Sequence, residues 1–170
     1  MRRFQASLGR KVMIITGLVV VILVVVSISS VVVRNDMNQV AQLALIILPF
    51  SALGIGLLFR VWSYDVYADH IRIRRMAFPV NVPIDSLKTV EQSPEMMSHS
   101  VRNFGNGGLF GFYGRFWEPG FGKFHAYVTN PENTVRMTVE NKNVALSPDQ
   151  PEDFVLLLRE RMDSAASPAS

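Results

Sequence analysis

The sequence predicts two N-terminal transmembrane helices followed by an all-β domain of about seven strands, which a C-terminal helix caps. Three observations predict this: two long apolar runs near the start, alternating segments after residue 61, and a helix-start signal at 147–153. The 170 residues include no cysteine, which excludes a disulfide framework, a thiolate nucleophile and a zinc ribbon.

The two apolar runs, 12–33 and 39–59, carry no charged residue. Each is long enough to cross about 30 Å of hydrocarbon, because a helix needs roughly 20 residues to do so. Residues 34–38 are then an external turn, and residues 1–11 a basic lead at the headgroup surface. Lysine and arginine gather before the first run and after the second, and they mark the cytoplasmic side. We therefore expect a multi-pass protein with both termini in the cytoplasm.

Two alternatives remain for the apolar runs. They can be buried core helices of a globular protein, although two successive charge-free runs of this length are rare in such proteins. The first run can also be a signal peptide cleaved near Ser27 and Ser29. Its length and the lack of an Ala-x-Ala site favour a retained helix.

Residues 61–163 are predicted to form one β domain. Residues 61–67 and 70–76 read as a hairpin, and 87–91, 121–129 and 134–140 as further strands, because apolar and polar residues alternate in several of them. Pro151 suits the first turn of a helix, and Phe154 and Leu158 belong to an apolar stripe at helical spacing. Residues 164–170 are small and polar, and we expect them to be disordered.

The segment 104–123 is the most unusual part of this domain, because seven of the eleven glycines lie in it among aromatic residues. One interpretation is a twisted hairpin whose aromatic side chains fill the core. Another is an exposed loop that enters a bilayer interface or a partner groove, and a third is a small-ligand site. On the second interpretation the interaction surface consists of Phe110, Phe112, Tyr113, Arg115, Phe116, Trp117 and the basic side chains Arg72, Arg74 and Arg75.

No pattern of catalytic, cofactor-binding or metal-ligating residues is present. His70, His99 and His125 are scattered, and no nucleophile elbow or phosphate-binding loop occurs. The chain after residue 61 holds more acidic than basic residues, which argues against nucleic-acid binding. We therefore expect no cofactor and name no catalytic residue.

Several segments resemble the bacterial pleckstrin-homology (PH)-like domains. They are Val-Pro-Ile-Asp-Ser-Leu at 82–87, the glycine–aromatic run at 108–114, Gly-Lys-Phe-His-Ala-Tyr-Val-Thr at 122–129 and Leu-Ser-Pro-Asp-Gln-Pro-Glu-Asp-Phe at 146–154. The resemblance implies a bent sandwich or partly open barrel of about seven strands, capped by a C-terminal helix. It also implies a bacterial inner-membrane location. Eukaryotic relatives hold phosphoinositide headgroups around the first hairpin loop, but here that loop, Ala68-Asp69, is short and acidic.

The resemblance implies a binding or scaffolding module at the cytoplasmic membrane face rather than an enzyme. Its expected partners are the lipid bilayer and either other proteins or further copies of the chain. Two alternatives stay open. One is sensing of lipid headgroups or the membrane surface through 104–123, and the other is a membrane-associated enzyme with an unrecognised site.

Overall fold

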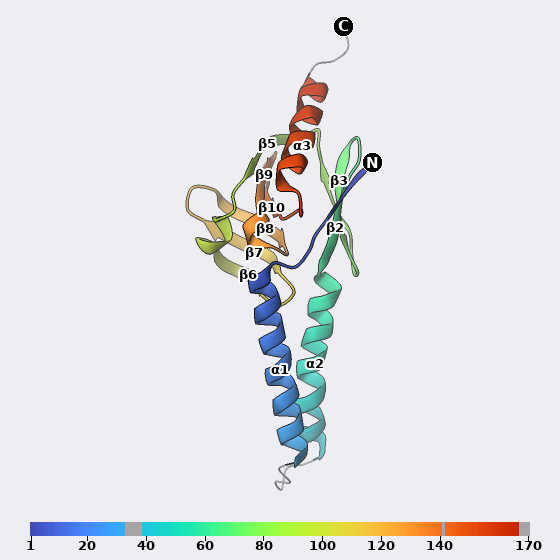
Figure 1. Cartoon of the computed structure of the whole chain (residues 1–170), viewed down its shortest axis with the longest axis vertical. Coiled ribbons are helices and arrows are strands. Elements are labelled where there is room, and N and C mark those ends of the chain that lie inside the picture. The colour runs from blue at the N-terminus through green and yellow to red at the C-terminus, as the bar shows by residue number, and fades with distance from the viewer. Residues whose placement is uncertain (33–38, 141, 167–170) are drawn as a thin grey trace.

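Two helices leave the same end of a body of β-strands and run side by side away from it (Figure 1). They are α1 (Arg10–Val32) and α2 (Gln39–Phe59). This computed structural model describes residues 1–32, 39–140 and 142–166. The predicted turn at 34–38 therefore lies outside the described residues, as do residues 167–170 of the predicted tail.

The helices match the two apolar runs only in part. The described residues contain one helix, Arg10–Ser30, that is long and apolar enough to cross a membrane, and 11% of its apolar window is buried. The apolar stretch of α2, Leu43–Phe59, is shorter. At 1.5 Å per residue it covers about 26 Å, somewhat less than the roughly 30 Å of a hydrocarbon core. The described residues thus support one of the two predicted full-length spans, and the second helix is somewhat shorter than expected.

Residues 2–5 of the predicted surface lead at 1–11 form a strand, and residues 10 and 11 already belong to α1. Strand β1 (Arg2–Gln5) pairs antiparallel with β2 (Val61–Val66), with Phe4 opposite Tyr64. Phe4 is buried, and its ring meets that of Phe154 edge-on at 5.0 Å between centroids. Besides Phe4, the ion pair between Arg3 and the buried Asp65 of β2 attaches this strand to the sheet.

The strands form two sheets that do not close into a barrel. One has the order β1-β2-β3-β4 and the other the order β5-β9-β10-β8-β7-β6. The remaining strands are β3 (His70–Arg75), β4 (Val80–Pro83), β5 (Leu87–Gln92), β6 (Val101–Gly107), β7 (Phe112–Glu118), β8 (Gly122–Val128), β9 (Val135–Val139) and β10 (Lys142–Leu146). Nine described strands thus follow α2, instead of about seven. One strand that alternation did not predict is β4, which is four residues long and ends at Pro83.

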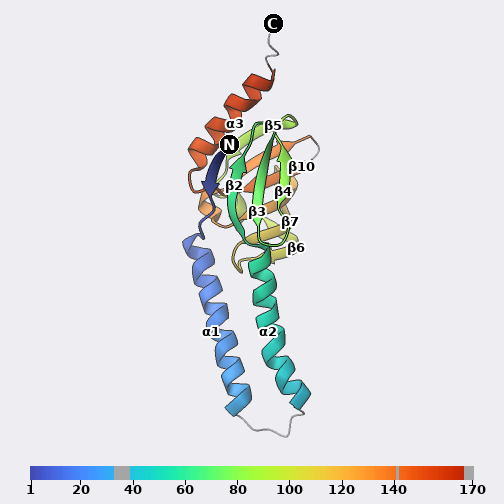
Figure 2. The same cartoon turned by 90° about the vertical axis from the view of Figure 1, so that its right-hand side faces the viewer.

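The main core lies between the two sheets and α3 (Pro151–Ala166) (Figure 2). The predicted stripe of α3 is buried through Phe154 and Leu158. The helix continues through residues 164–166, which corrects the predicted start of disorder there. A smaller cluster around Phe116 and Phe124 lies under a 3-10 turn at Met96–Ser98.

A buried hydrogen-bond network joins the two sheets at Tyr64. Its hydroxyl donates to the carbonyl of Tyr127 at 2.6 Å and accepts from the amide of Ser147 at 3.0 Å. Burial raises the pKa of Tyr64 to about 12. The neutral phenol is therefore the form that the folded protein holds.

Candidate functional site

The β6–β7 hairpin reaches down to the two helices, and its tip is bonded to α1. The amide of Phe110 donates to the hydroxyl of Thr16 at 3.0 Å, and that hydroxyl donates to the carbonyl of Gly108 at 3.4 Å. Gly108, Phe110 and Gly111 all have positive φ angles, and the amide of Gly108 donates to the carbonyl of Gly111. The glycines allow this turn to be tight enough to fit against a helix.

The same tip packs against α2 at Gly56. A Cβ built on Gly56 would lie 3.1 Å from the side chain of Leu109 and 3.2 Å from that of Phe110. The absence of a side chain at Gly56 therefore lets the hairpin approach the helix closely. The β domain and both helices are joined at this point, although they are far apart in the sequence.

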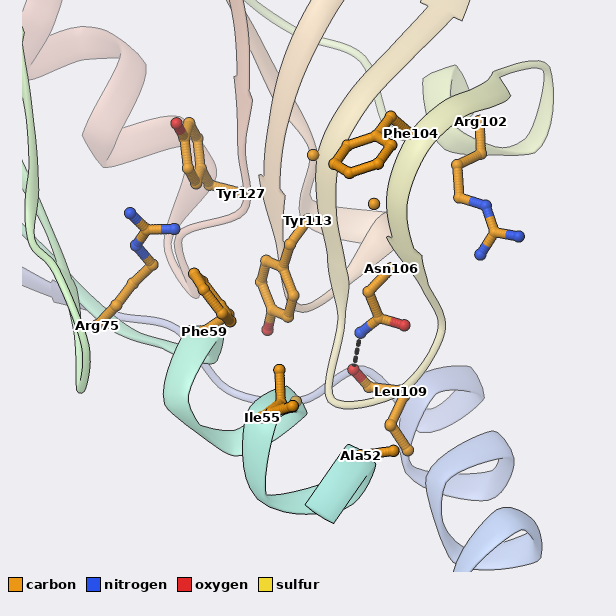
Figure 3. A pocket seen from close by; sticks show the side chains of 13 residues that line it. Ala52, Ile55, Phe59, Arg75, Arg102, Phe104, Asn106, Leu109, Tyr113 and Tyr127 are labelled. Atoms are coloured by element: carbon orange, nitrogen blue, oxygen red, sulfur yellow. Dashed lines mark hydrogen bonds between the residues drawn. The ribbon is translucent and has the colours of Figure 1, made fainter. Parts of the chain in front are cut away.

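A cavity of about 500 Å³ lies between α2 and the edge of the six-stranded sheet (Figure 3). We call it the α2 groove. One face of α2 lines it, since its four helical residues recur as i, i+3, i+4 and i+7. The β strands form the other walls. Its lining residues are Ala52, Ile55, Gly56, Phe59, Arg75, Arg102, Phe104, Gly105, Asn106, Leu109, Tyr113, Gly114 and Tyr127.

Two neutral polar side chains of the α2 groove already hydrogen-bond to the backbone of the hairpin. Asn106 donates its amide hydrogen to the carbonyl of Leu109, and the hydroxyl of Tyr113 donates to the carbonyl of Phe110. Burial raises the pKa of Tyr113, so its phenol stays neutral. These two neutral groups are thus engaged within the protein.

The two cationic side chains lie on opposite sides of the groove (Figure 3). Arg75 donates from Nε to the carbonyl of Phe78 at 2.9 Å, and its guanidinium lies 5.7 Å from the ring of Phe59 and 5.4 Å from that of Tyr127. Among the described residues, no carboxylate pairs with Arg75 or Arg102. No acidic residue lines the groove. The electrostatic character of the groove is therefore positive on an apolar background.

Exposed apolar residues surround the end of α2. The amide of Ala77 donates to the carbonyl of Leu58 at 3.0 Å, which brings the β3–β4 loop level with the last turn of this helix. In that loop Met76 and Phe78 are 62% and 68% exposed, and on the edge strand β6 Phe104 is 77% exposed. The sequence interpretation missed these three residues. For two of them the sequence offered a signal, since Met76 and Phe78 directly follow the arginine-rich strand at 70–75.

The structure separates the residues of the predicted interaction surface. Phe116 belongs to the smaller core cluster, Phe112 packs against that cluster, and Tyr113 is buried. Phe110 is half-buried at the hairpin tip, while Trp117 is 42% exposed. The segment 104–123 is therefore a hairpin, β6–β7, with most of its aromatic side chains packed, as the first interpretation expected.

The basic residues of that predicted surface lie in three different places. Arg115 lines a cavity of about 420 Å³ with Lys123, His125 and Lys142, on strands of the six-stranded sheet. Partial burial, together with the positive charges of Arg115 and Lys142, lowers the pKa of His125, which favours its neutral form.

Arg72, Arg74 and Arg75 line a further cavity of about 410 Å³ beside Asp65. Asp65 is buried and accepts from Nε of Arg3 at 2.7 Å, while Arg74 lies 3.9 Å from it. The ion pairs around Asp65 hold β1 in place, which gives these arginine side chains a structural role. Arg75 alone belongs to both this cavity and the α2 groove.

The described residues contain no group of three or more histidine, cysteine, aspartate or glutamate side chains that could hold a metal ion. Asp65 and Asp149 have structural roles, because both contact the N-terminal segment. Asp65 binds Arg3, and Asp149 accepts from the amide and hydroxyl of Ser7. The groove therefore offers binding through apolar contact and positive charge.

Comparison with known proteins identifies a family. The sequence model of a family described as bacterial PH domain matches residues 62–162, which is more than half of the chain. Searches of curated proteins and of solved structures gave no match.

Proposed function

The chain belongs to the bacterial PH domain family, and from this premise we propose that it holds a binding module at the surface of a membrane into which α1 and α2 insert together. PH domains are generally non-catalytic modules that bind lipids or proteins. The observation that carries the proposal is the docking of the hairpin tip onto Thr16 and Gly56, which fixes the module directly above two exposed apolar helices.

The exposure of both helices supports their insertion. Along the described part of α1 most large apolar side chains are exposed, including Leu18, Val21 and Val25, and α2 exposes Leu43, Ile47 and Leu48. Such an extended apolar surface is costly in water, at roughly 25 cal/mol for each Å². In lipid it costs nothing, and helices are the form in which a single segment satisfies its own backbone there. A slightly short α2 can be accommodated by tilting or local thinning of the bilayer.

The exposed residues near the end of α2 fit the interface of that membrane. Met76, Phe78 and Phe104 would enter the headgroup region together with Arg60, whose guanidinium lies 4.3 Å from the ring of Trp62. Aromatic and basic side chains are favoured at this depth. The β6–β7 hairpin and the β3–β4 loop would then contact the membrane surface.

The termini are proposed to be cytoplasmic, with α1 and α2 as a two-helix hairpin of the inner membrane. Basic residues flank the helices on the side of the β domain, at Arg2, Arg3, Arg10 and Lys11 and again at Arg60. Signal-peptide cleavage near Ser27 is disfavoured because it would remove β1, whose Phe4 is part of the core. Protein partners or further copies of the chain would bind the module from the cytoplasm.

Two measurements on cells that produce the full chain test this proposal. The protein should stay in the membrane pellet after extraction with alkaline carbonate. Protease added to intact spheroplasts should leave the β domain whole, and should digest exposed parts only after lysis. Release by carbonate would contradict insertion, whereas digestion of the β domain in intact spheroplasts would contradict the proposed orientation alone.

A further inference from the structure

The α2 groove is lined like a site for an amphiphile. Its helical wall is apolar through Ala52, Ile55 and Phe59, and its volume of about 500 Å³ lies within the roughly 300–1,000 Å³ of typical ligand sites. Ile55 and Phe104 are 55% and 77% exposed, so the groove is open rather than sealed. In water these open apolar walls would be a liability.

The apolar wall continues along α2 away from the β domain. Leu48, Ala52, Ile55 and Phe59 recur at helical spacing, so they form one stripe, and Leu48 is 66% exposed. If α2 lies in a bilayer, an acyl chain alongside Leu48 has an uninterrupted apolar path into the groove. The stripe therefore favours a lipid occupant that arrives from the membrane over a water-soluble one.

Much of the free hydrogen-bonding capacity of the groove is cationic. Asn106 and Tyr113 already donate to carbonyls of the hairpin. Arg75 uses only Nε, for the carbonyl of Phe78, and its two terminal nitrogens have no hydrogen-bond partner among the described residues. Guanidinium groups bind phosphate through such paired donors. No acidic side chain lines the groove to compete for them.

We propose that the α2 groove binds one anionic phospholipid, with an acyl chain against Ala52 and Ile55 and its phosphate at Arg75. This inference rests on the proposed insertion of α2 into a membrane. Arg102, on the opposite side, adds to the positive potential that favours an anionic lipid. The groove lies at the end of β3 next to α2, opposite the β2–β3 turn at residues 67–69. The bound lipid would join α2 to the edge of the six-stranded sheet.

The test uses the full chain purified in detergent and titrated with dioleoyl phosphatidylglycerol or dioleoyl phosphatidylcholine, with bound lipid counted by native mass spectrometry. Wild type should hold one phosphatidylglycerol, with about tenfold higher affinity than for phosphatidylcholine. Equal binding of the two lipids would overturn the proposal.

Two matched pairs of variants locate the site. Ala52→Trp fills the groove and should lower phosphatidylglycerol binding about tenfold, because close-packed side chains leave no room for a chain. Gly54→Trp is its control, because nothing lies within 4 Å of a Cβ built there and the position is on the opposite face of α2. Unchanged binding in Ala52→Trp, or an equal loss in Gly54→Trp, would overturn the proposal.

The second pair tests the phosphate contact without filling the groove. Arg75→Gln should bring the affinities for the two lipids to within about twofold of each other, because a charge-assisted contact is removed. Arg72→Gln, on the same strand but outside the groove, should keep the preference. A preference that survives Arg75→Gln would overturn the phosphate assignment even if Ala52→Trp does not fold.

The outcomes separate this inference from the function on which it rests. Release of wild type by alkaline carbonate would overturn both, since a groove outside the membrane has no lipid supply. Retention in the membrane together with lipid binding that ignores Ala52→Trp would overturn the groove assignment alone.

Discussion

Replacing Phe4 with alanine tests whether the N-terminal strand is part of the β domain. Phe4 is 2% exposed and meets Phe154 edge-on, and it belongs to the core shared by both sheets. Truncation of a buried phenylalanine costs about 3–5 kcal/mol, through lost transfer free energy and the cavity left behind. We expect about 3 kcal/mol here, because β1 is an edge strand that can relax into the space.

Unfolding of the full chain in detergent, followed by tryptophan fluorescence, measures this effect. Trp62 is a suitable reporter because its carbonyl accepts from the amide of Ala6 at 3.1 Å, directly after β1. For a domain of about 100 residues, 3 kcal/mol corresponds to a fall in Tm of more than about 10 °C. Gln5→Ala, at an exposed position of the same strand, should change the free energy of unfolding by less than about 0.5 kcal/mol. Equal, small shifts in the two variants would refute the assignment of β1 to the core.

Three further substitutions test the network at Tyr64 and the hairpin tip. Tyr64→Phe should cost about 1–3 kcal/mol in the free energy of unfolding, because the amide of Ser147 and the carbonyl of Tyr127 lose a buried partner. The pKa of Tyr64 is raised from its ordinary value near 10 to about 12. Its contribution to the free energy of unfolding is therefore fully present below pH 10 and is lost between about pH 10 and 12. Denaturant unfolding across this range should show the stability difference between wild type and Tyr64→Phe shrinking, and a constant difference would contradict this. Gly111→Ala should destabilise by about 3 kcal/mol, since its φ is 139° and the new Cβ would lie 2.6 Å from the carbonyl oxygen of Val128. Gly120→Ala, with positive φ but open space, should cost only about 1 kcal/mol in the same thermal assay, and equal costs would exclude the clash. Thr16→Val should speed hydrogen exchange at the amide of Phe110 about fivefold, because the hydroxyl that accepts from this amide is lost. Thr16→Ser keeps the hydroxyl and should leave the exchange rate unchanged. Identical exchange in wild type and both variants would show that the hairpin tip is held without the Thr16 hydrogen bond.

Local patterns predicted much of the β domain because each depends on neighbouring residues. Alternation placed β3, β8 and β9, since a half-buried strand must turn every second side chain inward. Pro151 and the acidic residues after it marked the start of α3, where they suit the first turn and the helix dipole. The apolar runs indicated α1 and α2, because the length of a charge-free run is likewise a local property of the sequence.

The register of β6 shows where such patterns fail. The pairing of β6 with β7 shifts between Arg102 and Phe104, so one residue of β6 is left over. Such a bulge changes which side chains face outward. Phe104 is therefore exposed while Phe116 on β7 is buried, although both lie in the same aromatic segment. Composition alone could not distinguish these two phenylalanines.

The sequence by itself determined the order of elements: apolar helices first, then short strands, then an amphipathic helix. It did so because periodicity and helix-start signals are local. Only the tertiary structure decided that residues 2–5 complete a sheet with strand β2, and that the hairpin tip rests on Thr16 and Gly56. The α2 groove likewise exists because α2 lies beside an edge strand about 50 residues away in sequence. Contacts of that kind depend on how the chain closes on itself, which no local pattern records.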